Sequence, residues 1–199
     1  MSTVTAASLN KEDTYVVDKL DVSDCRELGS DAVFTISSSK PGNGVEQIRD
    51  NNLETYWQSD GSFPHLINIQ FLRKTTISKL CIYLDYNLDE SYTAKKVSIC
   101  SGTCMHDLVD TKTVELNEPI GWVVIPLRDP CMSSEYIESG GHLRAHLIQI
   151  KILSMHQNGR DTHIRQVKIL GPRESSKVMA NFNYDSFKTS EMIQYASIR

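Results

Sequence analysis

Alternation of apolar and polar side chains along short runs is the feature of this sequence that most restricts its fold. In the runs LINIQF (66–71) and LIQIKI (147–152), every second side chain is apolar and its neighbours are often polar. Successive side chains of a β-strand point to opposite faces, so such a run has one buried face and one wet face. The alternation predicts strands that each cover one side of a hydrophobic core.

Eight runs rich in β-branched and aromatic residues are separated by turn-forming residues. A helical turn fits residues 44–49, but no segment keeps a 3.6-residue period over three turns, so the helices that join parallel strands are missing. The sequence therefore predicts an all-β fold, an antiparallel β-sandwich or jelly roll. The predicted strands lie at 32–37, 66–71, 76–84, 96–100, 112–116, 121–126, 146–153 and 166–170.

The chain of 199 residues is long enough for one domain with tails. Residues 1–24 contain few large apolar side chains, so we expect a largely disordered N-terminal arm. Residues 25–172 contain the strand runs and form the predicted sandwich. Residues 173–199 have the composition of a linker with scattered aromatic anchors, and DPCMSSEYIESGG (129–141) is interpreted as a surface insertion between two strands.

Charge and cysteine content limit which classes of partner and which cellular compartment are expected for this chain. The 21 basic and 25 acidic residues give a net charge of -4, so neither nucleic acid nor an anionic membrane is an expected partner. No apolar stretch approaches the ~20 residues that span a bilayer, and the N-terminus lacks the pattern of a signal peptide. Five cysteines without paired C-x-x-C spacing favour free thiols in the cytosol or nucleus.

Common motifs of catalysis and metal binding do not occur in the sequence. There is no G-x-S-x-G elbow, no G-x-x-x-x-G-K-[ST] phosphate loop and no H-E-x-x-H zinc motif. His142 and His146 on a strand would lie about 13 Å apart, too far to share one zinc ion. We therefore expect no enzyme, no cofactor and no metal site. A glycosidase or esterase stays an alternative through its loop carboxylates, although no spacing singles out a pair among Asp50, Asp60, Asp89, Glu90 and Asp161.

Two polar segments contain more functional groups than a simple turn requires. RDNNLETYWQSDG (49–61) surrounds Trp57 with turn-forming side chains, and we interpret Trp57 as a core residue. HQNGRDTH (156–163) places a cation, an anion, amides and two imidazoles between two strand runs, where an Asn-Gly bend alone would make a hairpin. This density of donors and acceptors suits a peptide or a sugar, so recognition is the favoured role. Cys100 and Cys104 are interpreted as unreactive thiols that flank a hairpin loop.

The order of these pieces resembles a known family. An Asn-x-x-Thr-x-Trp loop before an apolar strand, and a last strand after a polar loop, resemble the galactose-binding-like, discoidin-type jelly roll. The strings GNGVEQIRDNNLETYWQSDGSFPHLINIQF, LDESYT and HQNGRDTHIRQVKI together resemble the Doc-domain subunits of the anaphase-promoting complex, a ubiquitin ligase of the cell cycle. The resemblance covers residues 25–172, while the loops 100–104 and 129–141 depart from the family pattern.

The resemblance implies a non-catalytic subunit that promotes ubiquitination of mitotic substrates in the nucleus and cytoplasm. Such a subunit forms a receptor for the destruction-box degron together with a β-propeller coactivator, and it raises processivity. The final dipeptide, Ile198 and Arg199, resembles the tail that docks in grooves of tetratricopeptide-repeat scaffold subunits. The residues implied to face the degron or the coactivator are Ser91, Tyr92, His156, Gln157, Asn158, Gly159, Arg160 and Asp161.

Another binding function is compatible with the same fold. A jelly roll of this type could bind carbohydrate or a membrane, and in some fold relatives the end loops hold a metal ion. Extracellular modules of that kind commonly contain disulfides and follow a signal peptide, which the odd cysteine count and the N-terminal sequence do not favour. Binding to a glycan array would discriminate this alternative from a ligase subunit.

Overall fold

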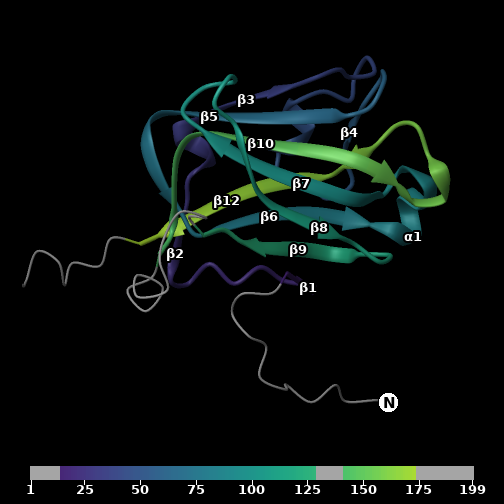
Figure 1. The fold of residues 1–199 in the computed structure, drawn as a ribbon. Helices are drawn as coiled ribbons and strands as arrows, with labels where there is room; N and C mark the ends of the chain where they lie inside the picture. The colour runs from purple at the N-terminus through teal and green to yellow at the C-terminus, as the bar shows by residue number, and fades with distance from the viewer. Residues whose placement is uncertain (1–13, 129–140, 174–199) are drawn as a thin grey trace, which may run out of the picture.

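The computed structural model describes residues 14–128 and 141–173, and two antiparallel sheets face each other in it (Figure 1). The first sheet has the strand order β1 (Tyr15–Val17), β9 (Ile120–Pro126), β6 (Lys79–Asp85), β12 (Gln166–Pro172) and β2 (Cys25–Glu27). The second has the order β3 (Ala32–Ile36), β5 (His65–Ile77), β10 (Leu143–Met155), β7 (Ala94–Gly102) and β8 (Val109–Glu115). A short pair, β4 (Trp57–Gln58) with β11 (His163–Ile164), lies beside them. The predicted all-β antiparallel sandwich is confirmed.

The alternating runs place their apolar residues between the two sheets. Ile67 on β5 lies opposite Ile150 on β10, and both side chains are completely buried. Their polar neighbours Asn68 and Gln149 lie on the other face of the sheet, where the Gln149 amide donates a hydrogen bond to the Asn68 side-chain oxygen over 2.7 Å. Hydrophobic burial of the inner face is therefore the main source of stability of the sandwich.

One predicted strand boundary was wrong. The run 76–84 was expected to be a single strand, but β5 continues to Ile77 and β6 begins at Lys79. Between them Ser78 turns the chain from one sheet to the other, and both its backbone N–H and its hydroxyl donate to the Leu170 carbonyl. These hydrogen bonds to Leu170 of β12 replace the strand ladder at the corner, because a buried backbone group needs a partner.

The expectation of a disordered arm over residues 1–24 is wrong for its second half. Strand β1 pairs with β9, and Tyr15 and Val17 pack against a small apolar cluster on the outer face of the first sheet. That cluster is centred on Trp122 and the buried Cys81. Apolar partners on the sheet supply the burial that the arm alone lacks. Residues 1–13, 129–140 and 174–199 lie outside the described residues, so the expected insertion at 129–141 and the expected tail at 173–199 stay predictions.

The cysteines of the described residues are free thiols, as expected: Cys25, Cys81, Cys100 and Cys104. Cys131 lies outside the described residues. The two cysteines do not flank the hairpin loop as expected, because Cys100 lies in β7 and Cys104 lies within the β7–β8 connection itself, residues 103–108. Burial raises the pKa of the Cys81 thiol to about 12, which keeps it protonated and inert at neutral pH.

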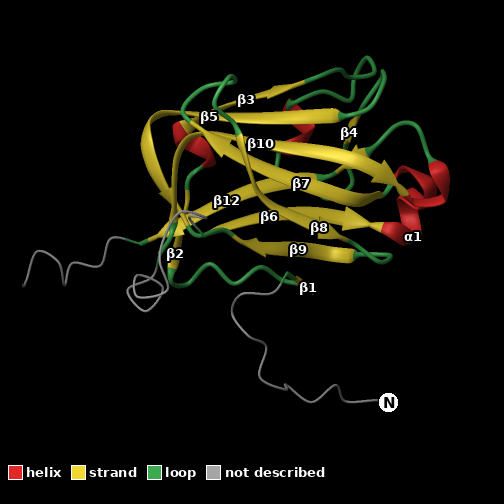
Figure 2. Ribbon diagram, in the orientation of Figure 1, coloured by secondary structure: helices red, strands yellow, loops and turns green. Residues whose placement is uncertain are grey.

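In residues 14–128 and 141–173, helical structure is limited to single turns, shown in red in Figure 2. The turn predicted at residues 44–49 is the 3-10 helix η2 (Glu46–Ile48), and a second 3-10 turn, η1 (Gly29–Asp31), directly precedes β3. Three further turns gather at one end: α1 (Tyr86–Asp89), η3 (Glu90–Tyr92) and η4 (His156–Asn158). Within the described part of the chain, no helix has the length and apolar character needed to cross a membrane.

Candidate functional site

Two loops that are distant in the sequence meet at one end of the sandwich, and we call them the recognition loops. The first, residues 86–93, joins β6 to β7, and the second, residues 156–162, joins β10 to β11. The His156 N–H donates to the Thr93 carbonyl over 3.0 Å. A Cβ added at Gly159 would lie 1.9 Å from the Ser91 carbonyl oxygen, so the two backbones are in direct contact there. All eight residues implied to face a ligand belong to these loops.

The second recognition loop presents several polar groups to solvent. Gln157, Asn158 and Arg160 are exposed, and Gln157 donates a hydrogen bond to the Tyr86 hydroxyl over 3.1 Å. Asp161 forms an ion pair with Lys40 at 2.9 Å. A surface hollow of about 320 Å³ lies between the turn at residues 60–61 and Arg160 and Asp161. The arrangement offers hydrogen-bond donors and acceptors around a hollow, which suits a polar ligand.

The second recognition loop does not form a hairpin turn at Asn158 and Gly159. Gln157 and Asn158 have the left-handed φ values of 50° and 56°, whereas Gly159 has a φ of -56°. Strand β10 pairs with β5 and β7, while β11 pairs with β4, so the loop crosses between sheets. Glycine is needed at position 159 because Ser91 lies against it, and not because of its dihedral angles.

Two members of the predicted set support the loops from within. His156 is buried, and its ring meets the Tyr86 ring edge-on at a centroid distance of 5.1 Å. Tyr92 stacks on His163 with centroids 4.2 Å apart and planes 7° apart, leaving 38% of the tyrosine exposed. The histidine side chain is therefore placed to hold the loop, and the tyrosine has one face covered and another available to a ligand.

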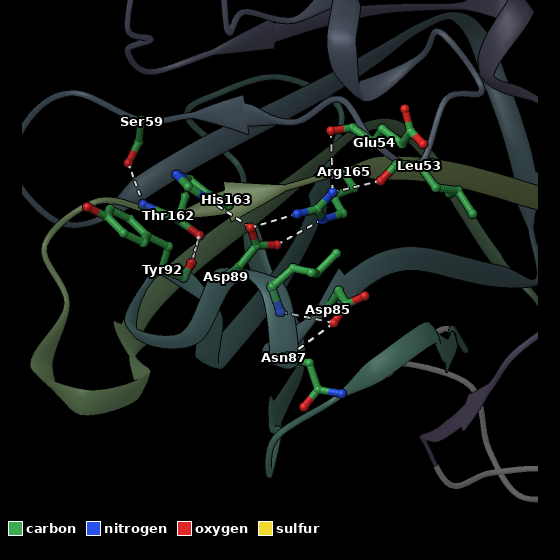
Figure 3. A network of polar contacts seen from close by, with 11 residues as sticks. Leu53, Glu54, Ser59, Asp85, Asn87, Asp89, Tyr92, Thr162, His163 and Arg165 are labelled. Carbon is green, nitrogen blue, oxygen red and sulfur yellow. Dashed lines mark hydrogen bonds and ion pairs between the residues drawn. The ribbon is translucent and has the colours of Figure 1, made fainter.

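A buried carboxylate lies beneath both recognition loops (Figure 3). The Asp89 Oδ1 atom accepts hydrogen bonds from His163 Nδ1 at 3.0 Å and from Arg165 Nη2 at 2.8 Å, and Oδ2 accepts one from Arg165 Nε at 2.9 Å. Asp89, His163 and Arg165 are exposed over only 5%, 8% and 5% of their surfaces. We call these three residues the Asp89 cluster.

Arg165 also reaches a third loop, residues 50–56. Its Nη1 atom donates to the Leu53 carbonyl at 2.8 Å and to the Glu54 carbonyl at 3.4 Å. The neighbouring Gln166, itself buried, accepts a hydrogen bond from the Asn51 N–H over 3.3 Å. The sequence alone did not predict this set, because Asp89 and Arg165 are 76 residues apart and Arg165 lies just before the final apolar strand run at 166–170.

The surroundings of Asp89 set its ionisation. Burial disfavours the charged carboxylate, yet the hydrogen bonds from His163 and Arg165 outweigh burial and hold the pKa of Asp89 below its usual range. The carboxylate is therefore charged at neutral pH and forms part of a buried ion pair. Asp89 therefore has a structural role. Because both of its oxygens are engaged by His163 and Arg165, it is not a free carboxylate of the kind that a glycosidase would need.

Over residues 14–128 and 141–173, no three His, Cys, Asp or Glu side chains are grouped so as to hold a metal ion. The docking residues Ile198 and Arg199 lie outside the described residues, so their role remains a prediction.

Mild acid is expected to lower the free energy of unfolding through His156. Burial and the nearby Lys95 lower the pKa of His156, which favours the neutral ring in the folded state. Stability from this neutral ring is complete above the unfolded pKa of ~6.5 and is lost as the pH falls through the lower folded pKa, with a slope of at most about 1.4 kcal/mol per pH unit. Denaturant titrations at pH values between 7.5 and 5 measure the free energy of unfolding. As the pH falls, this free energy should decrease less steeply for His156→Phe than for the unaltered chain. Equal slopes would contradict this assignment.

Similar solved structures define the fold further. A family 32 carbohydrate-binding module from Clostridium perfringens NanJ in complex with galactose aligns with a TM-score of 0.58 at 11% identity, covering 72% of this chain and 97% of the module. A second module from that organism, in complex with GalNAc-β-1,3-galactose, aligns with a TM-score of 0.58 at 10% identity, covering 72% and 99%. At such low identity the likeness shows the fold alone, and it confirms the galactose-binding-like jelly roll.

Sequence comparison identifies the family. The family model for anaphase-promoting complex, subunit 10, matches residues 5–197. The chain is 51% identical over 174 residues to anaphase-promoting complex subunit 10 of Homo sapiens, covering 87% of this chain and 88% of that protein. It is 44% identical over 154 residues to the subunit 10 of Schizosaccharomyces pombe, covering 77% and 78%. The chain belongs to the anaphase-promoting complex subunit 10 family.

Proposed function

We propose that this protein is a non-catalytic substrate-recognition and processivity subunit of the anaphase-promoting complex. In this proposal the recognition loops form a receptor for the destruction-box degron together with a β-propeller coactivator. The family membership supports the placement in the ligase. The observation that most supports a receptor at this end is the direct contact between Gly159 and Ser91, which joins both predicted ligand loops into one surface.

A degron is a short extended peptide, and the exposed groups of the second loop match its chemistry. Asn158 and Gln157 can hydrogen-bond peptide backbone, and Arg160 can bond carbonyl or carboxylate oxygens. Asp161 is less free to take a peptide cation than the sequence alone implied, because Lys40 already pairs with it at 2.9 Å. The coactivator would supply the apolar pocket.

Holding the peptide between two proteins explains a gain in processivity. Each site alone binds weakly, but a substrate held at one site on the ligase is presented to the other at high effective concentration. A longer residence time then allows more ubiquitins to be added in each encounter. No chemical step by this subunit is needed.

The hydrogen bonding of the loop carboxylates also favours a binding role over hydrolysis. Asp89 is held by His163 and Arg165, and Asp161 is paired with Lys40. Asp50 accepts the backbone N–H of Asn52 over 2.8 Å, as a turn-forming aspartate does. A glycosidase instead needs two carboxyl groups that converge on one bond.

We further propose that Ile198 and Arg199 dock the subunit in a tetratricopeptide-repeat scaffold groove, and that the protein works in the nucleus and cytoplasm. A branched apolar side chain can fill a pocket in such a groove while the guanidinium pairs with acidic side chains. Docking through the tail would leave the recognition loops free to face the coactivator.

The test separates docking from recognition. Three forms of the full chain are compared in pull-downs from dividing cells: the unaltered chain, one lacking Ile198 and Arg199, and one with Asn158, Arg160 and Asp161 changed to Ala. Each is scored for co-purified ligase subunits and for ubiquitin chain length on a destruction-box substrate. The tail deletion should lose the complex, and the loop variant should keep the complex but add shorter chains.

A matched control removes one cation and one anion elsewhere. Lys96 and Glu115 form an ion pair at 3.1 Å between β7 and β8, and changing both to Ala should leave chain length unaltered. Recovery of no ligase subunits with any form would overturn the proposed function. Binding of the unaltered chain to a glycan array in that case would favour the carbohydrate-binding alternative.

A further inference from the structure

The Asp89 cluster joins three separate loops through one buried carboxylate. Asp89 belongs to the first recognition loop, and His163 directly follows the second. Arg165 links both to the carbonyl groups of Leu53 and Glu54 in the third loop (Figure 3). Arg165 is buried and lies between β11 and β12, so all three loops are connected to one buried side chain.

A buried ion cluster of this kind contributes little to net stability. Desolvation of the charges offsets most of their attraction, and well-packed apolar side chains of similar volume are often equally or more stabilising. What the cluster does restrict is geometry, because a guanidinium binds a carboxylate only in a fixed, two-pronged arrangement. Its best physical use is to select one arrangement of the loops.

Backbone strain in the same three loops is an independent observation. Among the described non-glycine residues, five have positive φ, and four of them lie in or beside these loops, Glu118 being the exception. A residue held in such a conformation costs of order 1 kcal/mol or more and persists only when its surroundings enforce it. The four are Asn51 at 60°, Glu90 at 42°, Gln157 at 50° and Asn158 at 56°.

The histidine adds a second form of restraint. The His163 ring lies between the rings of Tyr56 and Tyr92, with centroid distances of 4.1 Å and 4.2 Å. Tyr56 belongs to the third loop and Tyr92 to the first recognition loop. The hydrogen bond to Asp89 sets the tilt of this ring, so the stack aligns Tyr92, whose outer part is exposed at the proposed degron site.

We propose that Asp89, His163 and Arg165 are positioning residues of peptide recognition, which hold three strained loops in the one arrangement that accepts the ligand. This inference rests on the proposed function. None of the three touches the peptide; they act through Tyr92 and through the second recognition loop. Without the cluster the loops relax toward conformations of lower backbone energy, and only a fraction of the molecules is competent to bind.

The first test uses Arg165→Lys in the assembled ligase. Lysine keeps the positive charge but cannot reach both Asp89 oxygens and the Leu53 carbonyl at once. If the competent fraction falls to about one tenth, the apparent affinity falls about tenfold. The expected result is an about tenfold higher KM for a destruction-box substrate with kcat unchanged, because saturating substrate restores the competent loops.

The matched control is Arg49→Lys. Arg49 likewise joins a carboxylate, Glu27 at 2.8 Å, to a backbone carbonyl, that of Val167 at 3.0 Å, and it contacts neither recognition loop directly. This control should leave the KM within twofold. Hydrogen exchange on the full chain should quicken at residues 50–56, 86–93 and 156–162 for Arg165→Lys and not for Arg49→Lys.

A rescue variant separates positioning from general stability. Glu90 is exposed and has a φ of 42° and a ψ of -110°, a region that glycine adopts without strain. Adding Glu90→Gly to Arg165→Lys should recover at least part of the lost affinity. If Arg165→Lys does not assemble, His163→Phe gives the same test, because it keeps a ring between the tyrosines and loses only the hydrogen bond to Asp89.

The outcomes distinguish this inference from the proposed function. An unchanged KM together with unchanged loop exchange in Arg165→Lys, or in His163→Phe where that substitute is used, would overturn the positioning role. If the triple loop variant at Asn158, Arg160 and Asp161 also leaves the KM unaltered, the degron assignment itself fails. If the triple variant raises the KM and neither cluster variant does, only the positioning inference is lost.

Discussion

Replacing Gly159 by alanine is expected to separate the recognition loops and to weaken destruction-box binding by about ten- to a hundredfold. The φ and ψ of Gly159, -56° and 153°, suit any residue, so the effect is purely steric. An added Cβ would meet the Ser91 carbonyl oxygen at 1.9 Å, and backbone cannot yield as a flexible side chain can. Overpacking of this kind costs about 1–3 kcal/mol, and each 1.4 kcal/mol is tenfold in affinity.

The measurement for Gly159→Ala is the KM of a destruction-box substrate in the assembled ligase, with ligase incorporation as the second readout. Gly44→Ala is the control, because the nearest atoms to its added Cβ are 3.9 Å away. The control should behave as the unaltered chain does. A normal KM for Gly159→Ala would mean that the contact between the loops is not needed for recognition.

Replacing Trp57 by alanine is expected to lower the free energy of unfolding by about 3–5 kcal/mol. The side chain is completely buried, and its Nε1–H donates to the Ser38 carbonyl over 2.9 Å. Since domains of this size are stable by about 5–15 kcal/mol, the loss takes a large share of the total. Equilibrium denaturation of the full chain with urea measures it directly.

Trp57→Phe is the control for the cavity left by Trp57→Ala. Phenylalanine keeps much of the ring but leaves the Ser38 carbonyl without its donor, so a smaller loss of about 1–3 kcal/mol is expected. Trp57 lies opposite Ile164 in the β4–β11 pair, directly beside His163. Both variants should therefore disturb recognition as well as stability. An equal decrease in the free energy of unfolding for Trp57→Ala and Trp57→Phe would contradict a packing role of the indole.

The strands that the sequence predicted correctly are those whose apolar faces are long enough to show a period of two. The run 66–71 is part of β5, where buried and less buried residues alternate, and the run 147–152 is part of β10, where Ile148, Ile150 and Ile152 belong to the core. Trp57 was likewise expected in the core and is completely buried there. Local composition sufficed in these cases because burial of one face decides the structure.

The missed elements depend on partners that are far away in the sequence. Strands β1 and β2 have three residues each and β4 and β11 only two, too few for any periodicity to be seen. These short strands form because they hydrogen-bond to neighbouring strands, as β1 does to β9 and β2 does to β12. The same limit hid the Asp89 cluster, since no local pattern pairs an aspartate with an arginine 76 residues later.

The resemblance assigned the site to two loops and to eight residues in them, and that assignment stays a prediction. The resemblance gave the loops, and the structure brings them together through Ser91 and Gly159. It also places His156 in the interior and engages Asp161 with Lys40, which residue type alone does not reveal. Exposure and pairing are properties of the folded chain, so residue chemistry can only nominate candidates.

The position of β12 has a consequence for how the protein is made. Residues 166–172 form a central strand of the first sheet, between β6 and β2, and His163 and Arg165 come just before them. Synthesis on the ribosome proceeds from the N-terminus, so Asp89 leaves the ribosome long before its two partners do. A nascent chain stopped short of Arg165 would leave that carboxylate unpaired and the loops unaligned. The Asp89 cluster can therefore form only after residues 163–165 have been translated, late in the synthesis of the domain.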